Sequence, residues 1–125
     1  MKKSRNQRVY QSGTTPPVVP DSEINLKLYK SVQGHEKIMS WYKQLMNEIE
    51  VEYESLFVPT RFGQTYVIAA GDKSSKPVIM IPGIAGCAPL WRHQINELSK
   101  YFRVFALDIV GQPGKSDPNP PSVFN

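Results

Sequence analysis

Apolar positions along the first half of the chain predict a helix followed by a β-hairpin. Between residues 34 and 50, apolar side chains recur every three or four positions with charged and amide side chains between them, which is typical of an amphipathic helix. The stretch ESLFVPTRFGQTYVIAAG then holds two β-prone runs on either side of residues 61–64, which predicts a hairpin. Pro59 lies in the first run. We expect a sheet edge there, because proline cannot donate to a strand ladder.

The pattern of the second half predicts a βαβ unit. PVIMI is a continuous apolar run, as expected of a strand covered on both faces. The turn PGIAGCAPL leads to a helix with Trp91, Ile95, Leu98 and Phe102 on one face, and RVFALDIV is another unalternating β run. Two such strands joined by a helix pair in parallel through a right-handed crossover. We therefore expect an α/β fold with the hairpin and both strands in one four-stranded sheet.

Length and charge divide the chain into regions. The 125 residues allow one hydrophobic core. The net charge of +4 comes from residues 1–20, which hold Lys2, Lys3, Arg5 and Arg8 and no acid, whereas residues 21–125 hold eleven basic and eleven acidic side chains. We interpret residues 1–20 as a basic disordered tail, 21–55 as a helical extension and 56–125 as the α/β part. The tail carries no nucleic-acid reader motif, so no nucleic-acid partner is expected.

Composition also predicts a cytoplasmic protein without a membrane, metal or cofactor partner. The longest nearly apolar stretch, residues 78–91, is broken by prolines and glycines and is shorter than the roughly 18 residues of a membrane span. The start MKKSRNQRVYQSG lacks the apolar segment of a secretory signal. Cys87 is the single cysteine, as is common in the cytoplasm. No His/Cys cluster has the spacing of metal ligands, and we expect no cofactor.

Two groups of reactive side chains are interpreted as structural. Cys87 precedes a helix, where a thiol can be activated, but no histidine is placed to serve it, so we interpret it as a small residue in a tight turn. Glu48, Glu50, Glu52 and Glu54 alternate along the chain and do not converge as an acid pair. We expect them to form a solvated edge.

Glycine-containing turns suggest two nucleotide-binding alternatives, and both are disfavoured. GQPGKS would need a glycine five residues before Gly114 to be a phosphate loop, and Ile109 stands there. PGIAG after a strand has only Gly83 and Gly86 rather than the three glycines of a dinucleotide fingerprint. A nucleotide-binding βαβ domain remains the less favoured alternative.

Four consecutive segments together resemble the opening of the α/β-hydrolase fold. They are TRFGQTYVIAAG, IPGIAG, LWRHQINELSKYFRV and ALDIVGQPGKSDPN: a hairpin, a strand ending in a Pro-Gly turn, a helix with a tryptophan near its start, and a strand ending in aspartate before an Asp-x-x-Gly-x-x-Gly-x-Ser loop. The resemblance covers roughly residues 56–121. The preceding helix resembles N-terminal extensions of bacterial, esterase- or lipase-like members. The resemblance implies a partial α/β-hydrolase sheet with the strand order first, second, fourth, third.

The resemblance also implies a site in the turn after the third strand. In this family a backbone N–H of that turn supplies one half of the oxyanion hole. By position the donor is Ile84, with Ala85 as its neighbour. Gly83 is the turn glycine, because a turn that aims an amide at a ligand often needs a conformation that glycine adopts at little cost. Pro82 stands where the family commonly has histidine, which does not remove a backbone donor.

The catalytic residues that the family uses are absent from this sequence. No Gly-x-Ser-x-Gly nucleophile elbow occurs, and Ser116, the nearest approach, is followed by Asp117 rather than glycine. His35 and His93 lie upstream of the position of the family's catalytic base, and we interpret both as surface histidines. We expect an N-terminal fragment that ends before the elbow, inactive by itself, of an enzyme that hydrolyses a small ester-like substrate through a serine. The alternative is a non-catalytic remnant or a small interaction module.

The implied strand order leaves PVIMI at an edge of the sheet. Its outer side would pair with a strand that these residues do not contain, and its apolar side chains would be exposed there. Such an edge recruits other strands. We therefore expect self-association through this edge.

Overall fold

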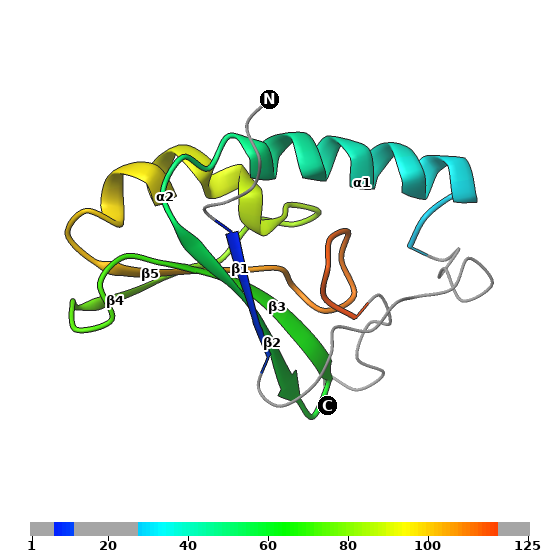
Figure 1. Ribbon diagram of the computed structural model, residues 1–125. Coiled ribbons are helices and arrows are strands. Elements are labelled where there is room, and N and C mark those ends of the chain that lie inside the picture. The colour runs from blue at the N-terminus through cyan, green and yellow to red at the C-terminus, as the bar shows by residue number, and fades with distance from the viewer. Residues whose placement is uncertain (1–6, 12–27, 118–125) are drawn as a thin grey trace.

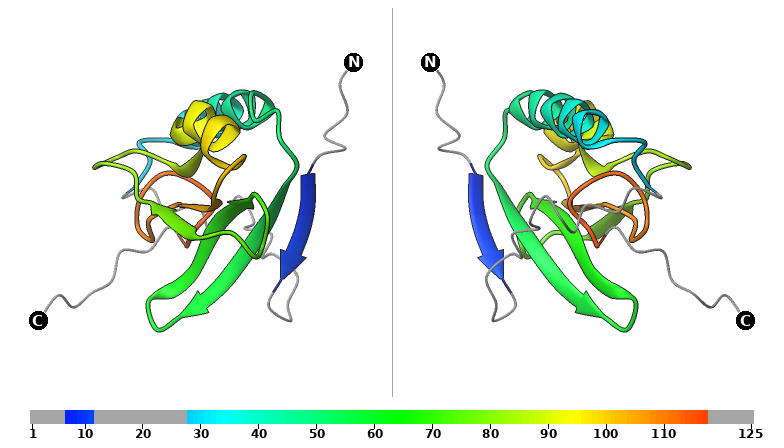
Figure 2. Two further views of the ribbon diagram at one scale, coloured as in Figure 1. Left: turned by 90° about the vertical axis from the view of Figure 1, so that its left-hand side faces the viewer. Right: turned by 90° about the vertical axis from the view of Figure 1, so that its right-hand side faces the viewer.

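The structure, a computed structural model, describes residues 7–11 and 28–117 (Figure 1). Its elements are β1 (Gln7–Gln11), α1 (Val32–Asn47), β2 (Tyr53–Thr60), β3 (Gly63–Ala70), β4 (Pro77–Met80), the 3-10 helix η2 (Ala88–Trp91), α2 (Arg92–Leu98) and β5 (Arg103–Leu107). The five strands form one sheet in the order β1-β2-β3-β5-β4. Figure 2 shows α1 and α2 together on one face of this sheet. Among the described residues, no helix is both long and apolar enough to cross a membrane.

The predicted hairpin is confirmed. β2 and β3 pair antiparallel along their whole length, with Thr60 opposite Gly63 at the turn. The outer side of β2 pairs with β1 only from Tyr53 to Phe57, so Pro59 lies beyond that ladder. The missing N–H of this proline therefore interrupts no pairing with β1.

The predicted parallel pair and its strand order are confirmed as well. Val78 of β4 pairs with Val104 of β5 in a parallel register, and β5 runs antiparallel to β3. The connecting helix is shorter than its apolar spacing predicts, because the N–H groups of Tyr101 and Phe102 both bond to the Leu98 carbonyl and close the helix there. Phe102 thus lies after α2, in the turn that leads into β5.

Part of the stretch predicted to be a disordered tail is a strand. Gln7–Gln11 forms β1 and pairs parallel with β2, which adds a fifth strand to the four expected. This correction has a simple reason: β2 offers an unpaired edge, and backbone pairing with such an edge requires no apolar pattern in the added strand. Residues 1–6 and 12–20 of the predicted tail lie outside the described residues.

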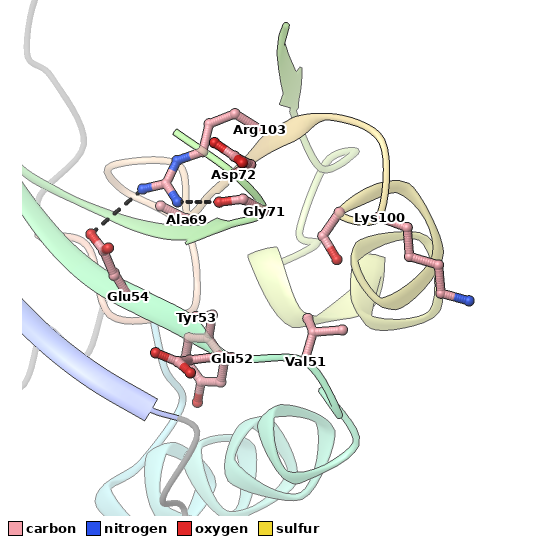
Figure 3. A pocket seen from close by; sticks show the side chains of 10 residues that line it. Val51, Glu52, Tyr53, Glu54, Ala69, Gly71, Asp72, Lys100 and Arg103 are labelled. Carbon is pink, nitrogen blue, oxygen red and sulfur yellow. Dashed lines mark hydrogen bonds and ion pairs between the residues drawn. The ribbon is translucent and has the colours of Figure 1, made fainter. Parts of the chain in front are cut away.

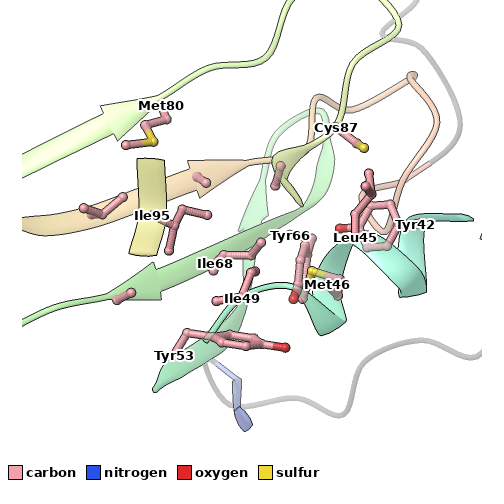
Figure 4. Close-up of a cluster of buried hydrophobic side chains, with 14 of the residues drawn as sticks. Tyr42, Leu45, Met46, Ile49, Tyr53, Tyr66, Ile68, Met80, Cys87 and Ile95 are labelled. Carbon is pink, nitrogen blue, oxygen red and sulfur yellow. The ribbon is translucent and has the colours of Figure 1, made fainter. Parts of the chain in front are cut away.

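The core lies between the two helices and one face of the sheet (Figure 4). The buried side chains of the helical layer and the segment after α1 are Tyr42, Leu45, Met46, Ile49 and Ile95, and those of the sheet are Tyr53, Phe57, Tyr66, Ile68, Ala70, Met80, Val104 and Ala106. Ile68 and Ile95 are fully buried. Each such side chain contributes about 1.5–3 kcal/mol relative to exposure.

The helical extension is joined to the βαβ unit by polar contacts. The Asn96 side chain on α2 accepts a hydrogen bond from the Glu50 N–H at 2.8 Å and donates to the Glu48 carbonyl at 3.0 Å. Arg92 forms an ion pair with the Glu48 carboxylate. These contacts take up backbone groups at the end of α1 and fix the angle at which the chain enters β2.

The interpretation of the alternating glutamates as a solvated edge is wrong for Glu54. Its carboxylate is largely buried and lies 3.5 Å from the guanidinium of Arg103, which is itself buried at the start of β5. β3 pairs with β2 on one side and with β5 on the other, and Glu54 and Arg103 meet across it on the sheet face opposite the helices. Periodicity along one segment carries no information on such a partner 49 positions away.

Candidate functional site

Two loops meet at the ends of the parallel strands β4 and β5. Residues 81–87 follow β4, and residues 108–117 follow β5 and form the orange loop of Figure 1. Because the carboxyl ends of parallel strands lie at the same edge of a sheet, both loops are on one side. In α/β sheets this is the edge at which ligands bind.

Asp108 joins this edge to the helices. Its side chain is fully buried. Oδ1 accepts the Ala88 N–H at 2.6 Å, and Oδ2 accepts both the Tyr42 hydroxyl at 2.6 Å and the Lys115 N–H at 2.7 Å. One carboxylate therefore holds α1, the first residue of η2 and the loop after β5 in fixed relative positions.

Asp108, which is buried, and Lys115, which is partly buried, both have shifted pKa values. Burial raises the pKa of Asp108, and the hydrogen bonds from Ala88, Lys115 and Tyr42 offset part of that shift. Burial lowers the pKa of Lys115, whose Nζ lies over the rings of Tyr66, at 4.9 Å from the centroid, and of Tyr42, at 5.4 Å. The faces of these rings attract the ammonium electrostatically.

The loop after β5 is fastened to β3. The Ser116 hydroxyl accepts the Tyr66 N–H at 2.8 Å and donates to the Asp108 carbonyl at 2.7 Å. The Asp117 carboxylate accepts the Gln64 N–H at 2.7 Å, and the Asp117 N–H donates to the Gln64 carbonyl at 2.9 Å. β5 pairs with β3 only from Val67 onward, so the loop covers the part of β3 that β5 leaves free. Both hydrogen-bonding roles of the Ser116 hydroxyl are occupied.

Gly114 is required where this loop passes Asp108. Its φ is +147°, and a Cβ atom there would lie 2.5 Å from the Asp108 Oδ2. No side chain fits at that distance. The second glycine of the Asp-x-x-Gly-x-x-Gly-x-Ser pattern therefore permits the close approach of the loop to the buried carboxylate.

The turn after β4 contains the residues expected to bind an oxyanion. Ala85 has a φ of +61°, and its N–H donates to the Gln112 Oε1 at 2.5 Å. The Gly86 N–H donates to the Gly83 carbonyl at 2.9 Å and closes the turn. The Ile84 side chain is 96% exposed. Ile84, Ala85 and Gly83 are thus adjacent at the edge where the loops meet.

The conformational reason predicted for glycine at Gly83 is wrong. Gly83 does not have a positive φ, and a Cβ atom there would contact nothing within 4 Å. The left-handed conformation falls on Ala85, two residues later. Alanine is not a residue that favours this conformation, so the sequence carried no signal for it.

Comparison with known proteins identifies the family. No protein-family model matches the chain. The chain is 32% identical to carboxylesterase YbfK of Bacillus subtilis over 91 residues. These residues are 73% of this chain and 31% of that protein. The crystal structure of that carboxylesterase superposes with a TM-score of 0.64 at 31% identity, over 71% of this chain and 30% of the other. The chain belongs to the α/β-hydrolase fold family.

A second curated relative agrees with this assignment. The uncharacterized carboxylesterase nap of Bacillus subtilis is 34% identical over 77 residues, which are 62% of this chain and 26% of that protein. The chain thus spans between a quarter and a third of the length of the curated carboxylesterases that it matches.

The Cys87 thiol lies next to the turn after β4 in this member of the α/β-hydrolase fold family, and it is not activated. It is buried, and burial followed by the proximity of Asp108 raises its pKa to about 11. A thiol with this pKa is protonated at neutral pH and is a poor nucleophile. The geometry agrees with the interpretation of Cys87 as a small residue of a tight turn.

A separate cavity of about 340 Å³ lies at the opposite edge of the sheet, where β5 begins (Figure 3). Arg103 lines it, donating to the Gly71 carbonyl at 2.8 Å and pairing with Glu54. Lys100, also in the lining, pairs with Glu97. Both of these cations therefore have a carboxylate partner among the described residues.

Proposed function

We propose that this chain supplies the oxyanion-binding turn of a carboxylic ester hydrolase. The observation that carries the proposal is the braced turn of residues 81–87 at the carboxyl end of β4, with its exposed Ile84. Relatives named as carboxylesterases support it. The substrate would be a small molecule with an ester or related bond.

The chemistry assigned to the turn is stabilisation of charge. When a nucleophile attacks an ester, the carbonyl oxygen becomes negative, and a preorganised backbone N–H that points at this oxygen lowers the barrier. We assign this role to the N–H of Ile84. The bond from Ala88 to the buried Asp108 keeps the turn in place, so that little reorganisation is needed during the reaction.

The serine, acid and histidine of such an enzyme are not among these 125 residues. The sequence contains no Gly-x-Ser-x-Gly, and the hydroxyl of Ser116 is buried and occupied by two hydrogen bonds. We therefore expect the 125-residue chain alone to show no saturable hydrolysis of p-nitrophenyl esters. We also propose a bacterial, cytoplasmic setting, which the Bacillus relatives and the single free cysteine support.

A chimera tests the proposal. The matching 91 residues of the Bacillus subtilis carboxylesterase YbfK are replaced by those of this chain, and hydrolysis of p-nitrophenyl butyrate is measured. We expect activity in the chimera. Ile84→Pro removes the N–H and should lower kcat roughly 100-fold or more, the cost of one lost oxyanion donor.

Ile84→Ala is the matched control. It keeps the N–H and shortens a side chain that is 96% exposed, so kcat should change little. A folded chimera without activity, or equal activity in the proline and alanine variants, would overturn the assignment of Ile84 as the donor.

A further inference from the structure

We propose that Gln112 is the positioning residue of the oxyanion-binding turn. Its side-chain carbonyl takes the Ala85 N–H, holds Ala85 in the left-handed conformation and leaves the Ile84 N–H as the donor for a ligand. The identity of that ligand as an ester carbonyl rests on the proposed function. The effect of Gln112 on the turn does not.

The conformation of Ala85 needs an outside support. In the left-handed region the Cβ atom crowds the backbone, and residues other than glycine and asparagine seldom adopt it. Gly83 and Gly86 stand on either side in the turn, yet neither has a positive φ. The hydrogen bond at 2.5 Å from Ala85 to the Gln112 Oε1 comes from 27 positions away and is available only while Ala85 keeps its orientation.

Gln112 is held firmly enough to provide this support. Its own N–H donates to the Ile109 carbonyl at 3.1 Å, and the Gly111 N–H donates to the Asp117 carbonyl at 2.8 Å. Asp117 is in turn fastened to β3 through Gln64. The side chain of Gln112 therefore projects from an anchored loop.

Two hydrogen bonds cross between the same two segments. Asp108 accepts from Ala88 at one end of the turn, and Gln112 accepts from Ala85 three residues earlier. The Gly86 N–H donates to the Gly83 carbonyl between these two bonds, so the segment from Gly83 to Ala88 is tied to the loop after β5. We therefore expect these bonds to restrict the conformations open to a short, exposed turn.

The bond from Ala85 also decides between the two candidate donors. An N–H group makes one strong hydrogen bond, and that of Ala85 is occupied by Gln112. Among the residues that the structure describes, none accepts a hydrogen bond from the Ile84 N–H. Ile84 is therefore the donor available to a carbonyl oxygen.

Nuclear magnetic resonance of the ¹⁵N-labelled 125-residue chain tests the inference. We expect the amide of Ala85 to exchange with water more slowly than that of Ile84. Ala85 should also show the strong intraresidue NOE between amide and α protons that marks a positive φ. Faster exchange at Ala85 than at Ile84 would overturn the inference without any variant.

Three variants extend this test. Gln112→Ala should accelerate exchange at Ala85 roughly five-fold, as expected for the loss of one hydrogen bond, and should weaken the intraresidue NOE. Gln112→Glu retains an acceptor oxygen and should preserve both signals. Gln94→Ala makes the same change at an exposed position of α2 and should leave Ala85 unaffected.

Unchanged exchange and an unchanged NOE at Ala85 in the Gln112→Ala variant would refute the positioning role. These signals do not depend on ester hydrolysis. An inactive chimera would therefore count against the proposed function alone, whereas an unperturbed Ala85 amide would count against the role of Gln112 alone.

Discussion

The hydroxyl of Tyr42 donates a hydrogen bond to the Asp108 carboxylate at 2.6 Å, across 66 positions of the sequence. Tyr42 lies on α1 and Asp108 follows β5, and both are buried. The contact places one polar bond inside the apolar layer between helix and sheet. A buried carboxylate without hydrogen-bond donors destabilises the folded state, so this bond contributes to stability. It also links the helical extension to the loops of the candidate site.

Removing this hydroxyl should destabilise the protein. In Tyr42→Phe the ring still fills its place, but the Asp108 carboxylate loses one of three donors. We expect the free energy of unfolding to fall by about 1–3 kcal/mol. Urea denaturation measures this. Tyr101→Phe, on a side chain that is 70% exposed, is the control and should change stability by less than about 0.5 kcal/mol. Equal effects of the two substitutions would count against the contact.

Stability should depend on pH through Asp108. Burial raises its folded-state pKa above the ordinary value of 3.8, so the folded state holds this proton more tightly than the unfolded state. The stability that this raised pKa contributes is fully present below the pKa of the unfolded state, and it is lost as pH rises through the pKa of the folded state. Asp108→Asn removes the titration. The free energy of unfolding of the wild type minus that of the variant should therefore decrease as pH rises from about 3 to about 7.

Asp72→Asn is the control for this pH dependence. Hydrogen bonds from Ser74 lower the pKa of this exposed carboxyl, so its contribution is present at higher pH and is lost as pH falls through the folded pKa. The free energy of unfolding of the wild type minus that of this variant should therefore change little with pH, and in the opposite direction. A flat difference for Asp108→Asn would show that the carboxyl is not perturbed.

Two glycines of the site should respond differently to alanine. Gly114→Ala would place a Cβ atom against Asp108 at a φ of +147°, and we expect a loss of about 3 kcal/mol or more, because both strain and a close contact result. Gly83→Ala should be tolerated, since no atom lies within 4 Å of its Cβ position and its φ is not positive. Thermal unfolding of both variants measures the contrast, and similar melting temperatures would contradict it.

Self-association should occur through β4. This strand pairs with β5 on one side and ends the order of strands in the sheet. Ile79 and the adjacent Ile81 are 63% and 60% exposed. We expect sedimentation at tens of micromolar to show dimers or larger species, because an apolar edge with unpaired backbone groups recruits another strand.

Ile79→Lys tests this edge directly, since a charge there opposes strand addition, and the variant should sediment as a monomer. Tyr101→Lys introduces the same charge at another exposed site and should leave association unchanged. A wild-type chain that is monomeric at these concentrations would refute the prediction.

Most of the elements, and the family, could be predicted from local patterns in the sequence. Apolar spacing located α1 and the hairpin, and the unbroken apolar runs located the parallel pair of β4 and β5. These signals are local, because burial on one face or both faces of an element is recorded in its own residues. The order of Pro-Gly turn, helix and Asp-x-x-Gly-x-x-Gly-x-Ser loop then indicated the α/β-hydrolase fold and the position of the candidate turn.

The contacts that hold that turn depend on tertiary structure and could not be predicted in this way. Asp108 binds partners 7 to 66 positions away, and Gln112 binds Ala85 across 27 positions. Polar side chains acquire such roles from the groups that folding brings within hydrogen-bond distance, and their residue type does not specify the partner. The left-handed conformation of Ala85 and the pairing of β1 with β2 could not be predicted for the same reason. Both involve hydrogen bonds of the backbone that form only in the folded state, and the residue types there do not favour them.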